Sequence, residues 1–284
     1  IGDSETENVK YYQEIKDAIR KKEFTLYYQP IIDLSTDSVF GFESLLRWKH
    51  PEFGVLPPSK FINIMEQTGD IFWIGLWGFE ELIKFYAEVK KYYPYQTFLA
   101  TLNVSPRQIY NVNFIDGIAK LAKKYRINTS NFAFEFAEFT LFEKQEDIRR
   151  HIAAIKNYGF KVAIDGMGID TNILAKLDKM PIDIIKINRD FLRDYEDDAG
   201  MRNVVQMLVD FGKRFNKRIV IEGVENEQAS TIAKNLSISL AQGYHYSPPI
   251  SDEEIVRFIG QMQSQPKGKL KSEEASKDKE KTQA

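Results

Sequence analysis

The sequence has no cysteine and only three histidines, and both shortages narrow its chemistry. Without thiols there are no disulfides, thiolate metal sites or cysteine nucleophiles, and the composition suits a reducing compartment such as the cytoplasm. His50, His151 and His245 lie far apart in the chain, so a histidine-rich zinc site is not expected. Any metal site must use mainly oxygen ligands, which favours Mg²⁺, Mn²⁺ or Ca²⁺.

The sequence also lacks a strong net charge and a membrane-length apolar run. A net charge of -2 gives no global attraction to DNA or to a membrane surface. The most apolar run, residues 71–79, has half the length needed to cross a bilayer, and we interpret it as the buried start of a helix. No signal peptide is recognised, and because the first residue is not Met we expect a piece of a longer protein.

What is present is an alternation of short apolar runs with helical patterns. The runs cover residues 24–34, 38–48, 97–105, 132–138, 160–165, 182–188, 218–223 and 237–244. This order predicts one α/β domain, a (β/α)₈ barrel of the TIM type. Only residues 35–37 separate the first two runs, too few for a parallel crossover, so we expect a hairpin and one antiparallel strand near the N-terminus. A doubly wound open sheet is the alternative, but no glycine-rich phosphate loop follows an early strand.

Two helices and the chain ends complete the predicted organisation. In residues 146–159 we expect a helix with Ile148, Ile152 and Ile155 on one face, ending at Gly159. In residues 201–216 we expect a second helix, whose apolar face is Val204, Leu208, Phe211 and Phe215. We divide the chain into a polar lead (1–9), a barrel domain (10–262) and a disordered charged tail (263–284). The mixed charges of the tail favour a solvated segment over one that touches anionic lipid or RNA.

Polar side chains recur near the ends of successive predicted strands. They are Glu43, Arg47, Asn103, Ser105, Glu135, Glu138, Asp165, Lys186, Glu222, Glu225 and Gln242. In a barrel these ends share one rim, where converging carboxylates repel each other unless a cation or proton lies between them. The pattern therefore predicts an acidic site for a divalent metal, with a lysine beside it. The alternative is a ring of surface charges on a non-catalytic barrel.

These pieces together resemble the EAL family of cyclic di-GMP phosphodiesterases and receptors, over roughly residues 10–262. The family's Glu-Ala-Leu motif has its counterpart in "ESLLRWKHPEFG" (43–54). Further similar pieces are "YYQPIIDL" (27–34), "PPSKFINIMEQTG" (57–69), "LNVSP" (102–106), "FEFAE" (134–138), "IIKIN" (184–188), "VIEGVEN" (220–226) and "AQGYHYSPP" (241–249). The family fold, a modified TIM barrel with one antiparallel strand, agrees with the predicted hairpin.

The resemblance implies hydrolysis of cyclic di-GMP to pGpG with Mg²⁺ or Mn²⁺, and inhibition by Ca²⁺. It implies four metal ligands, Glu43, Asn103, Glu135 and Asp165. It also implies that Lys186, Glu222 and Gln242 position the attacking water and complete the metal site, and that Gln29, Arg47 and Pro249 contact the cyclic dinucleotide. Glu138 corresponds to the acid that anchors the loop after the fifth predicted strand, residues 160–165. A homodimer and an attached sensor or cyclase domain are further expectations from the family.

The resemblance fails in "DGMGIDTN" (165–172), where the family has Asp-Asp-Phe-Gly-Thr-Gly and then an aromatic. Asp165 is kept, but the second acid is Gly166, which has no side chain to hold a cation. We therefore interpret Asp165 as a metal ligand that opens a glycine-rich turn, with one metal retained and the second weakened. Two smaller departures are Ser44 in the name motif and Ala137 in place of a threonine.

Three hypotheses follow from this mixture of retained and lost residues. The first is a cyclic di-GMP-binding signalling domain with weak or lost phosphodiesterase activity. The second is an active, slow metal-dependent phosphodiesterase, which the seven retained metal and water positions support. The third is a protein-interaction scaffold that no longer binds nucleotide.

Overall fold

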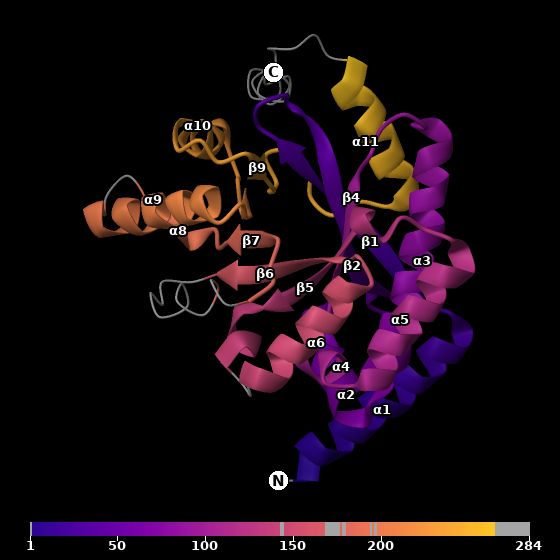
Figure 1. Ribbon diagram of the computed structural model, residues 1–284. Helices are drawn as coiled ribbons and strands as arrows, with labels where there is room; N and C mark the ends of the chain where they lie inside the picture. The colour runs from indigo at the N-terminus through magenta and orange to yellow at the C-terminus, as the bar shows by residue number, and fades with distance from the viewer. Residues whose placement is uncertain are drawn as a thin grey trace, which may run out of the picture.

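The computed structural model describes residues 2–142, 145–167, 177, 180–193, 195 and 198–264, and its strands form a closed barrel (Figure 1). The strands are β1 (Phe24–Asp33), β2 (Ser38–His50), β3 (Gly54–Leu56), β4 (Leu99–Asn103), β5 (Phe132–Ala137), β6 (Lys161–Met167), β7 (Ile184–Ile187), β8 (Arg218–Ile221) and β9 (Leu240–Ala241). Their order is β1-β9-β8-β7-β6-β5-β4-β2, and the pairing of β1 with β2 closes the ring. The predicted α/β barrel is therefore confirmed.

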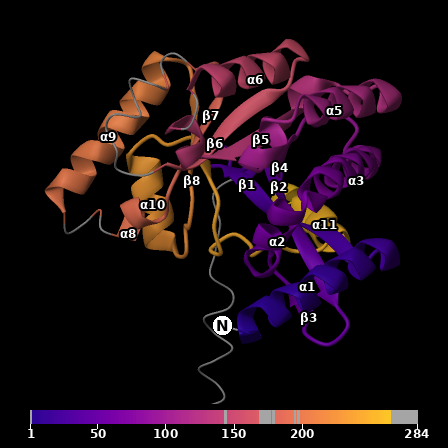
Figure 2. The same cartoon turned by 90° about the horizontal axis from the view of Figure 1, so that it is seen from below.

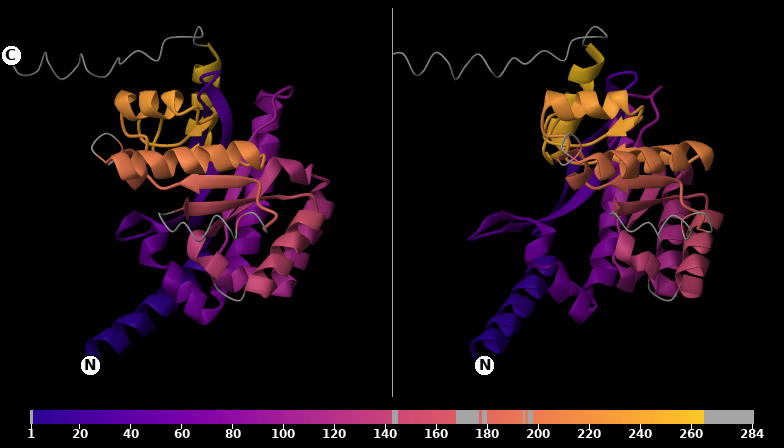
Figure 3. Two further views of the ribbon diagram at one scale, coloured as in Figure 1. Left: turned by 60° about the vertical axis from the view of Figure 1, so that its left-hand side comes forward. Right: turned by 90° about the vertical axis from the view of Figure 1, so that its left-hand side faces the viewer.

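Helices surround the barrel and cover its outer face (Figure 2). The α-helices are α1 (Gly2–Lys21), α2 (Ile62–Thr68), α3 (Asp70–Tyr92), α4 (Pro106–Ile109), α5 (Val112–Tyr125), α6 (Gln145–Asn157), α8 (Asp190–Arg193), α9 (Ala199–Arg214), α10 (Glu227–Asn235) and α11 (Asp252–Ser264), and short 3₁₀ turns are η1 (Pro58–Lys60), η2 (Thr129–Asn131) and η3 (Glu138–Phe142). The first half of α1 projects beyond the rest of the molecule (Figure 3). In the described part of the chain no helix is both long and apolar enough to cross a membrane.

β1 is the antiparallel strand that the short link before β2 predicted. It runs antiparallel to β2 and to β9, while the pairs from β2 through β4 to β9 are parallel. The turn is built locally, because the Asp33 carboxylate accepts a hydrogen bond from the Ser35 N–H at 2.9 Å. One strand escaped the sequence analysis: β3 pairs with β2 alone and forms a hairpin outside the barrel.

The interior of the barrel is layered. Its apolar layer consists of Ile31, Leu99, Ala133, Ala163, Ile184, Val220 and Leu240, all buried. Side chains two positions apart in a strand share a face. On the parallel strands, the residue two positions after each member of the apolar layer therefore also faces inward, one layer closer to the carboxyl end of the strand. Those residues are Thr101, Glu135, Asp165, Lys186, Glu222 and Gln242. Period-two alternation thus places an apolar floor beneath a polar layer.

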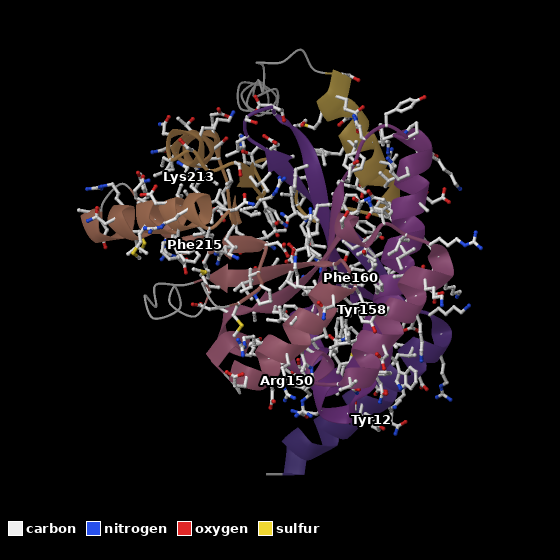
Figure 4. The ribbon with its side chains drawn as sticks, in the orientation of Figure 1. Tyr12, Arg150, Tyr158, Phe160, Lys213 and Phe215 are labelled. Carbon is white, nitrogen blue, oxygen red and sulfur yellow. The ribbon has the colours of Figure 1, made fainter. Side chains whose placement is uncertain are left out.

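The opposite face of each strand packs against the helices. On β5 this face is Phe132, Phe134 and Phe136, each no more than 1% exposed. Phe134 lies 5.1 Å from Phe160, measured between ring centroids, and 5.2 Å from Phe79 of α3. Burial of an aromatic side chain of this kind contributes roughly 1.5–3 kcal/mol. Figure 4 labels Phe160 at the start of β6, and also the exposed Arg150 and Lys213 on the surrounding helices.

Of the two predicted helix faces, that of α6 is confirmed and that of α9 is wrong in part. Ile148, Ile152 and Ile155 of α6 are buried, and Gly159 has a φ of 87° just after the helix, as a C-terminal cap requires. On α9 only Leu208 of the predicted set is fully buried, and Phe215 lies beyond the helix end with 39% of its surface exposed. The buried stripe of α9 is Met201, Val205, Leu208, Val209 and Gly212.

Three predicted boundaries differ from the structure. The last strand is confined to Leu240–Ala241, because the chain turns away to bring Gly243 against Val224. α1 begins at Gly2, so it runs through the predicted boundary at residue 9, and α11 continues to Ser264. The predicted tail from residue 265 onward lies outside the described residues.

Candidate functional site at the barrel rim

Lys186 lies at the centre of the polar layer and brings its carboxylates together. Its Nζ is 2.7 Å from Glu43 Oε2, 2.9 Å from Glu135 Oε2 and 2.9 Å from Glu222 Oε1. Asp165 Oδ1 is more distant, at 3.7 Å. The lysine side chain is 1% exposed, and an ammonium so deeply buried is stable only when carboxylates surround it.

Amide side chains complete this network on the β2 side. Asn103 Nδ2 donates to Glu43 Oε1 at 2.6 Å, and Gln242 Nε2 donates to Glu43 Oε2 at 2.8 Å. Gln242 Nε2 also donates to Gln29 Oε1 at 2.9 Å, and Gln29 Nε2 donates to the Ser247 carbonyl at 3.1 Å. Both oxygens of Glu43 are therefore held by groups at the ends of three different strands, namely Asn103, Lys186 and Gln242.

The electrostatic consequences differ from one carboxylate to the next. Burial opposes ionisation of Glu43, but the Lys186 charge and the hydrogen bonds outweigh it, so the pKa of Glu43 lies below its ordinary value. Burial, followed by the negative charge of Glu43, raises the pKa of Glu135 to about 8. Burial also raises the pKa of Glu222 to about 7, against the opposing charge of Lys186. Burial alone would lower the pKa of Lys186, but its carboxylates hold that pKa well above the ordinary value.

The rim residues offer oxygen donors to a divalent cation. Among the described residues, no three acidic or imidazole groups form a ready-made metal cluster, and the Lys186 ammonium lies where the carboxylates converge. The donors are nonetheless hard oxygens, as Mg²⁺ and Mn²⁺ require. Glu135 Oε1 and Gln242 Oε1 are buried and receive no hydrogen bond from any described residue, so two oxygens are available to a ligand. We conclude that the donor set fits a hard cation held beside Lys186.

The first residues of the altered segment 165–172 form a β-bulge rather than a turn. β6 continues through Asp165 to Met167, and its pairing with β7 shifts between Ile164 and Met167. Gly166 has a φ of 69°, which glycine adopts at little cost. The interpretation of Asp165 as the first residue of a turn is therefore wrong, because the strand passes it before the chain leaves the barrel. Residues 168–172 of the altered loop lie outside the described residues.

Two hollows flank the carboxylates at the rim. One, of about 450 Å³, has an apolar wall that includes Leu46, Ile62 and Ile74, and it reaches Glu43, Glu135 and Asp165. The other, of about 390 Å³, is lined by Gln29, Glu222, Gln242 and Tyr244 among others. Together they leave open space on both sides of the Lys186 network.

The remaining predicted residues lie at or near this rim. Arg47 is half-buried on β2, with its guanidinium 5.8 Å from the centre of the Tyr27 ring and Nη1 2.9 Å from the Leu46 carbonyl, and burial lowers its pKa. Pro249 precedes Ile250, which bridges to Tyr28. Glu138 begins η3 directly after β5, while the loop that it is predicted to anchor lies outside the described residues.

Two features of the rim are not among the predicted site residues. Asn188, Arg189 and Tyr244 line the second hollow, and their position at or directly after the ends of predicted strands is a signal for this. Ser44 is 1% exposed, and its Oγ donates to the Thr101 carbonyl at 2.6 Å. This hydrogen bond links β2 to β4 close to Glu43 and Asn103. Its hydroxyl is thus satisfied where the family motif has alanine.

The comparisons with known proteins agree with this architecture. The probable cyclic di-GMP phosphodiesterase PdeN of Escherichia coli is 29% identical over 247 residues, which cover 87% of this chain and 47% of PdeN. The bifunctional diguanylate cyclase/cyclic di-GMP phosphodiesterase MucR of Pseudomonas aeruginosa is 24% identical and is covered over 37% of its length. The chain spans about a third to a half of the first curated relatives it matches.

A solved structure supports the fold and the family. The EAL enzyme Bd1971, in its cAMP and cyclic di-GMP bound form, superposes with a TM-score of 0.83 at 25% sequence identity, covering 91% of this chain and 70% of that one. The family model described as the EAL domain matches residues 12–249. The chain therefore belongs to the EAL domain family.

Proposed function

We propose that this chain is a cyclic di-GMP-binding signalling domain that holds one divalent cation and hydrolyses its ligand slowly or not at all. The observation that carries the proposal is Gly166, which stands at the position of the family's second acid. Its φ of 69° belongs to a bulge, and a Cβ built there would meet no atom of a described residue within 4 Å, its two chain neighbours aside. No side chain from this position contributes a negative charge to a second cation.

The retained residues support binding of a first cation. Glu43, Asn103, Glu135 and Asp165 would hold it, and when bound it would supply positive charge beside a phosphodiester. Lys186 keeps these carboxylates together and places a further positive charge at the rim, and Glu222 and Gln242 face the same space. These groups bind, orient and neutralise a phosphate even where hydrolysis is slow.

The shape of the rim supports a ligand with two bases. A cyclic dinucleotide carries two bases joined by a central ring of phosphates and sugars. The two hollows lie on either side of the charged network, one with an apolar wall and one with the exposed Tyr244. Arg47, on β2 beside this network, offers a planar fork suited to a phosphate oxygen pair.

The second candidate is a slow phosphodiesterase, and one observation favours it. All the predicted metal and water residues except the missing second acid face one network around Lys186. A scaffold without ligand would not need to keep a lysine and four carboxylates at such a desolvation cost. Loss of one ion would still remove charge stabilisation, and loss of a single oxyanion donor elsewhere costs about 2.7–4 kcal/mol.

One experiment separates these functions. The purified protein is incubated with cyclic di-GMP and Mn²⁺, binding is followed by calorimetry, and pGpG is followed by chromatography. We expect saturable binding with little pGpG over hours. Rapid conversion to pGpG would establish the enzyme instead, and absence of heat at millimolar ligand would leave only the scaffold.

A further inference from the structure

We propose that the basic segment 267–271 of this chain's own tail docks as an extended strand in a groove between β1, α3 and α11. The groove lies away from the polar layer, on the side of the barrel where α11 packs against β1 and α3 (Figures 1 and 2). Its volume is about 710 Å³, and its apolar lining includes Leu26, Trp77, Phe85 and Val256. Tyr93, directly after α3, fixes one end by donating from its hydroxyl to the Val256 carbonyl at 2.8 Å.

The floor of the groove is an unpaired strand edge. β1 pairs with β9 only at Ile32 and Asp33, and Tyr28 exchanges two hydrogen bonds with Ile250, at 2.7 and 2.9 Å. Hydrogen-bonding direction alternates along an antiparallel strand, so the N–H and C=O of Leu26 point to the same side as those of Tyr28, away from β2. No described residue bonds to them there. An open edge of this kind accepts an added strand.

The charge of the groove selects a basic occupant. Four acids line it, Glu81, Glu88, Asp252 and Glu253, against two bases, Lys84 and Arg257. Glu81 is paired with Lys84 at 2.7 Å, whereas Asp252 and Glu253 form no ion pair with any described residue. These two acids also suit the N-terminus of α11, so they stabilise the helix and leave negative charge facing the groove.

The tail has the matching sequence and sufficient reach. Residues 265–271 read "QPKGKLK", in which lysines alternate with Gly268 and Leu270, so that a strand would place the three lysines on one face and Leu270 on the other. α11 ends at Ser264, and Arg257 lies about 10 Å back along that helix. Seven extended residues span roughly 23 Å, which is enough to turn back along α11 and reach β1. Pro266 suits the reversal that precedes the docked segment.

The test measures hydrogen exchange of the Leu26 amide in the full chain. The altered protein carries Lys267→Glu, Lys269→Glu and Lys271→Glu, and its matched control carries Lys277→Glu, Lys279→Glu and Lys281→Glu in the distal tail. We expect the unaltered protein and the control to exchange Leu26 at least tenfold more slowly than the altered protein. Leu270→Asp should accelerate exchange as the triple change does. Equal Leu26 rates in all four proteins would overturn the proposal.

Two further measurements identify the occupant. A chain ending at Ser264 keeps every described element and should regain Leu26 protection when a peptide of residues 265–284 is added. Protection of the Leu26 amide in the full chain should not change when the protein is diluted. Loss of this protection on dilution would mean that the tail of a second copy occupies the groove, and it would overturn docking within one chain. Binding of the tail to anionic vesicles without any effect on Leu26 exchange would overturn it as well.

Discussion

Asp165 and Gly166 are neighbours in the bulge of β6, but only Asp165 faces the Lys186 ammonium, with Oδ1 3.7 Å from Nζ. Gly166 has a φ of 69°, and no described residue apart from its chain neighbours lies within 4 Å of where a side chain would begin. The backbone at this position therefore suits glycine, and the described part of the chain leaves room for a first side-chain atom. The proposed role of a missing acid can therefore be tested directly by substitution at Gly166.

Replacement of Gly166 by aspartate should restore part of the second-cation chemistry. We expect Gly166→Asp to raise pGpG production with Mn²⁺, with the larger gain when the family sequence is also restored at residues 167–171. The left-handed backbone should cost about 1–2 kcal/mol of folding free energy. Turnover is read by chromatography and stability by urea unfolding.

Gly166→Asn is the matched control for this repair. It carries a similar backbone cost, since asparagine and aspartate both adopt positive φ more readily than most residues, but it adds no negative charge. Its turnover should stay at the level of the unaltered protein. If neither aspartate nor the restored loop gains over asparagine, the missing acid is not what limits hydrolysis.

Glu43 should be required for any response to metal. Glu43→Ala removes the acceptor for Asn103, Gln242 and Lys186, so we expect a loss of about 1–3 kcal/mol in stability without metal. We also expect Mn²⁺ to lose its stabilising effect, which for the unaltered protein should reach about 2.7 kcal/mol at a hundredfold excess over Kd. Thermal unfolding with and without Mn²⁺ measures both. Glu43→Gln should recover much of the lost stability without metal but none of the stabilisation by Mn²⁺. A full Mn²⁺ response in Glu43→Ala would contradict the role of Glu43 as a metal ligand.

Arg47 should contribute to nucleotide affinity rather than to folding. Hydrogen bonds to charged groups contribute about 1.5–3 kcal/mol, so Arg47→Ala should weaken cyclic di-GMP binding about 10- to 100-fold. Arg47→Lys should keep the charge but lose the planar fork, and the affinity of this variant should lie between those of the unaltered protein and Arg47→Ala. Calorimetry gives the affinities. Equal affinity in all three proteins would place the ligand elsewhere.

Gly243 should be essential for the close backbone approach to Val224 that positions Gln242. A Cβ on Gly243 would lie 2.2 Å from the Val224 carbonyl oxygen and 2.3 Å from its nitrogen, and backbone atoms cannot move aside cheaply. We expect Gly243→Ala to lower the free energy of unfolding by about 1–3 kcal/mol and to weaken metal binding. Gly54→Ala is the comparison, because its Cβ would meet nothing and only the positive φ opposes it. Urea unfolding should show the larger loss at Gly243.

The barrel and its polar rim were predictable from the sequence because both follow from period-two alternation. Once Ala133 and Ala163 are placed inside, Glu135 and Asp165 must face the same interior, and the short link after Asp33 requires an antiparallel strand. What could not be predicted depends on contacts between distant segments. The bulge at Gly166 depends on the register of β6 against β7, and the short β9 depends on the approach of Gly243 to Val224. The central place of Lys186 among four acids was also beyond reach, because sequence order gives no distances.

The apolar floor has a consequence for the order of events at the rim. Ile184, Val220 and Leu240 close the barrel beneath Lys186, so nothing enters or leaves from below. On the proposed function, a cation would therefore reach the site from the same side as the nucleotide, and a bound nucleotide would cover the cation. Chelators should then remove the ion quickly from the free protein and slowly from the nucleotide-bound protein, so that the residence time of the nucleotide sets how long the cation stays bound.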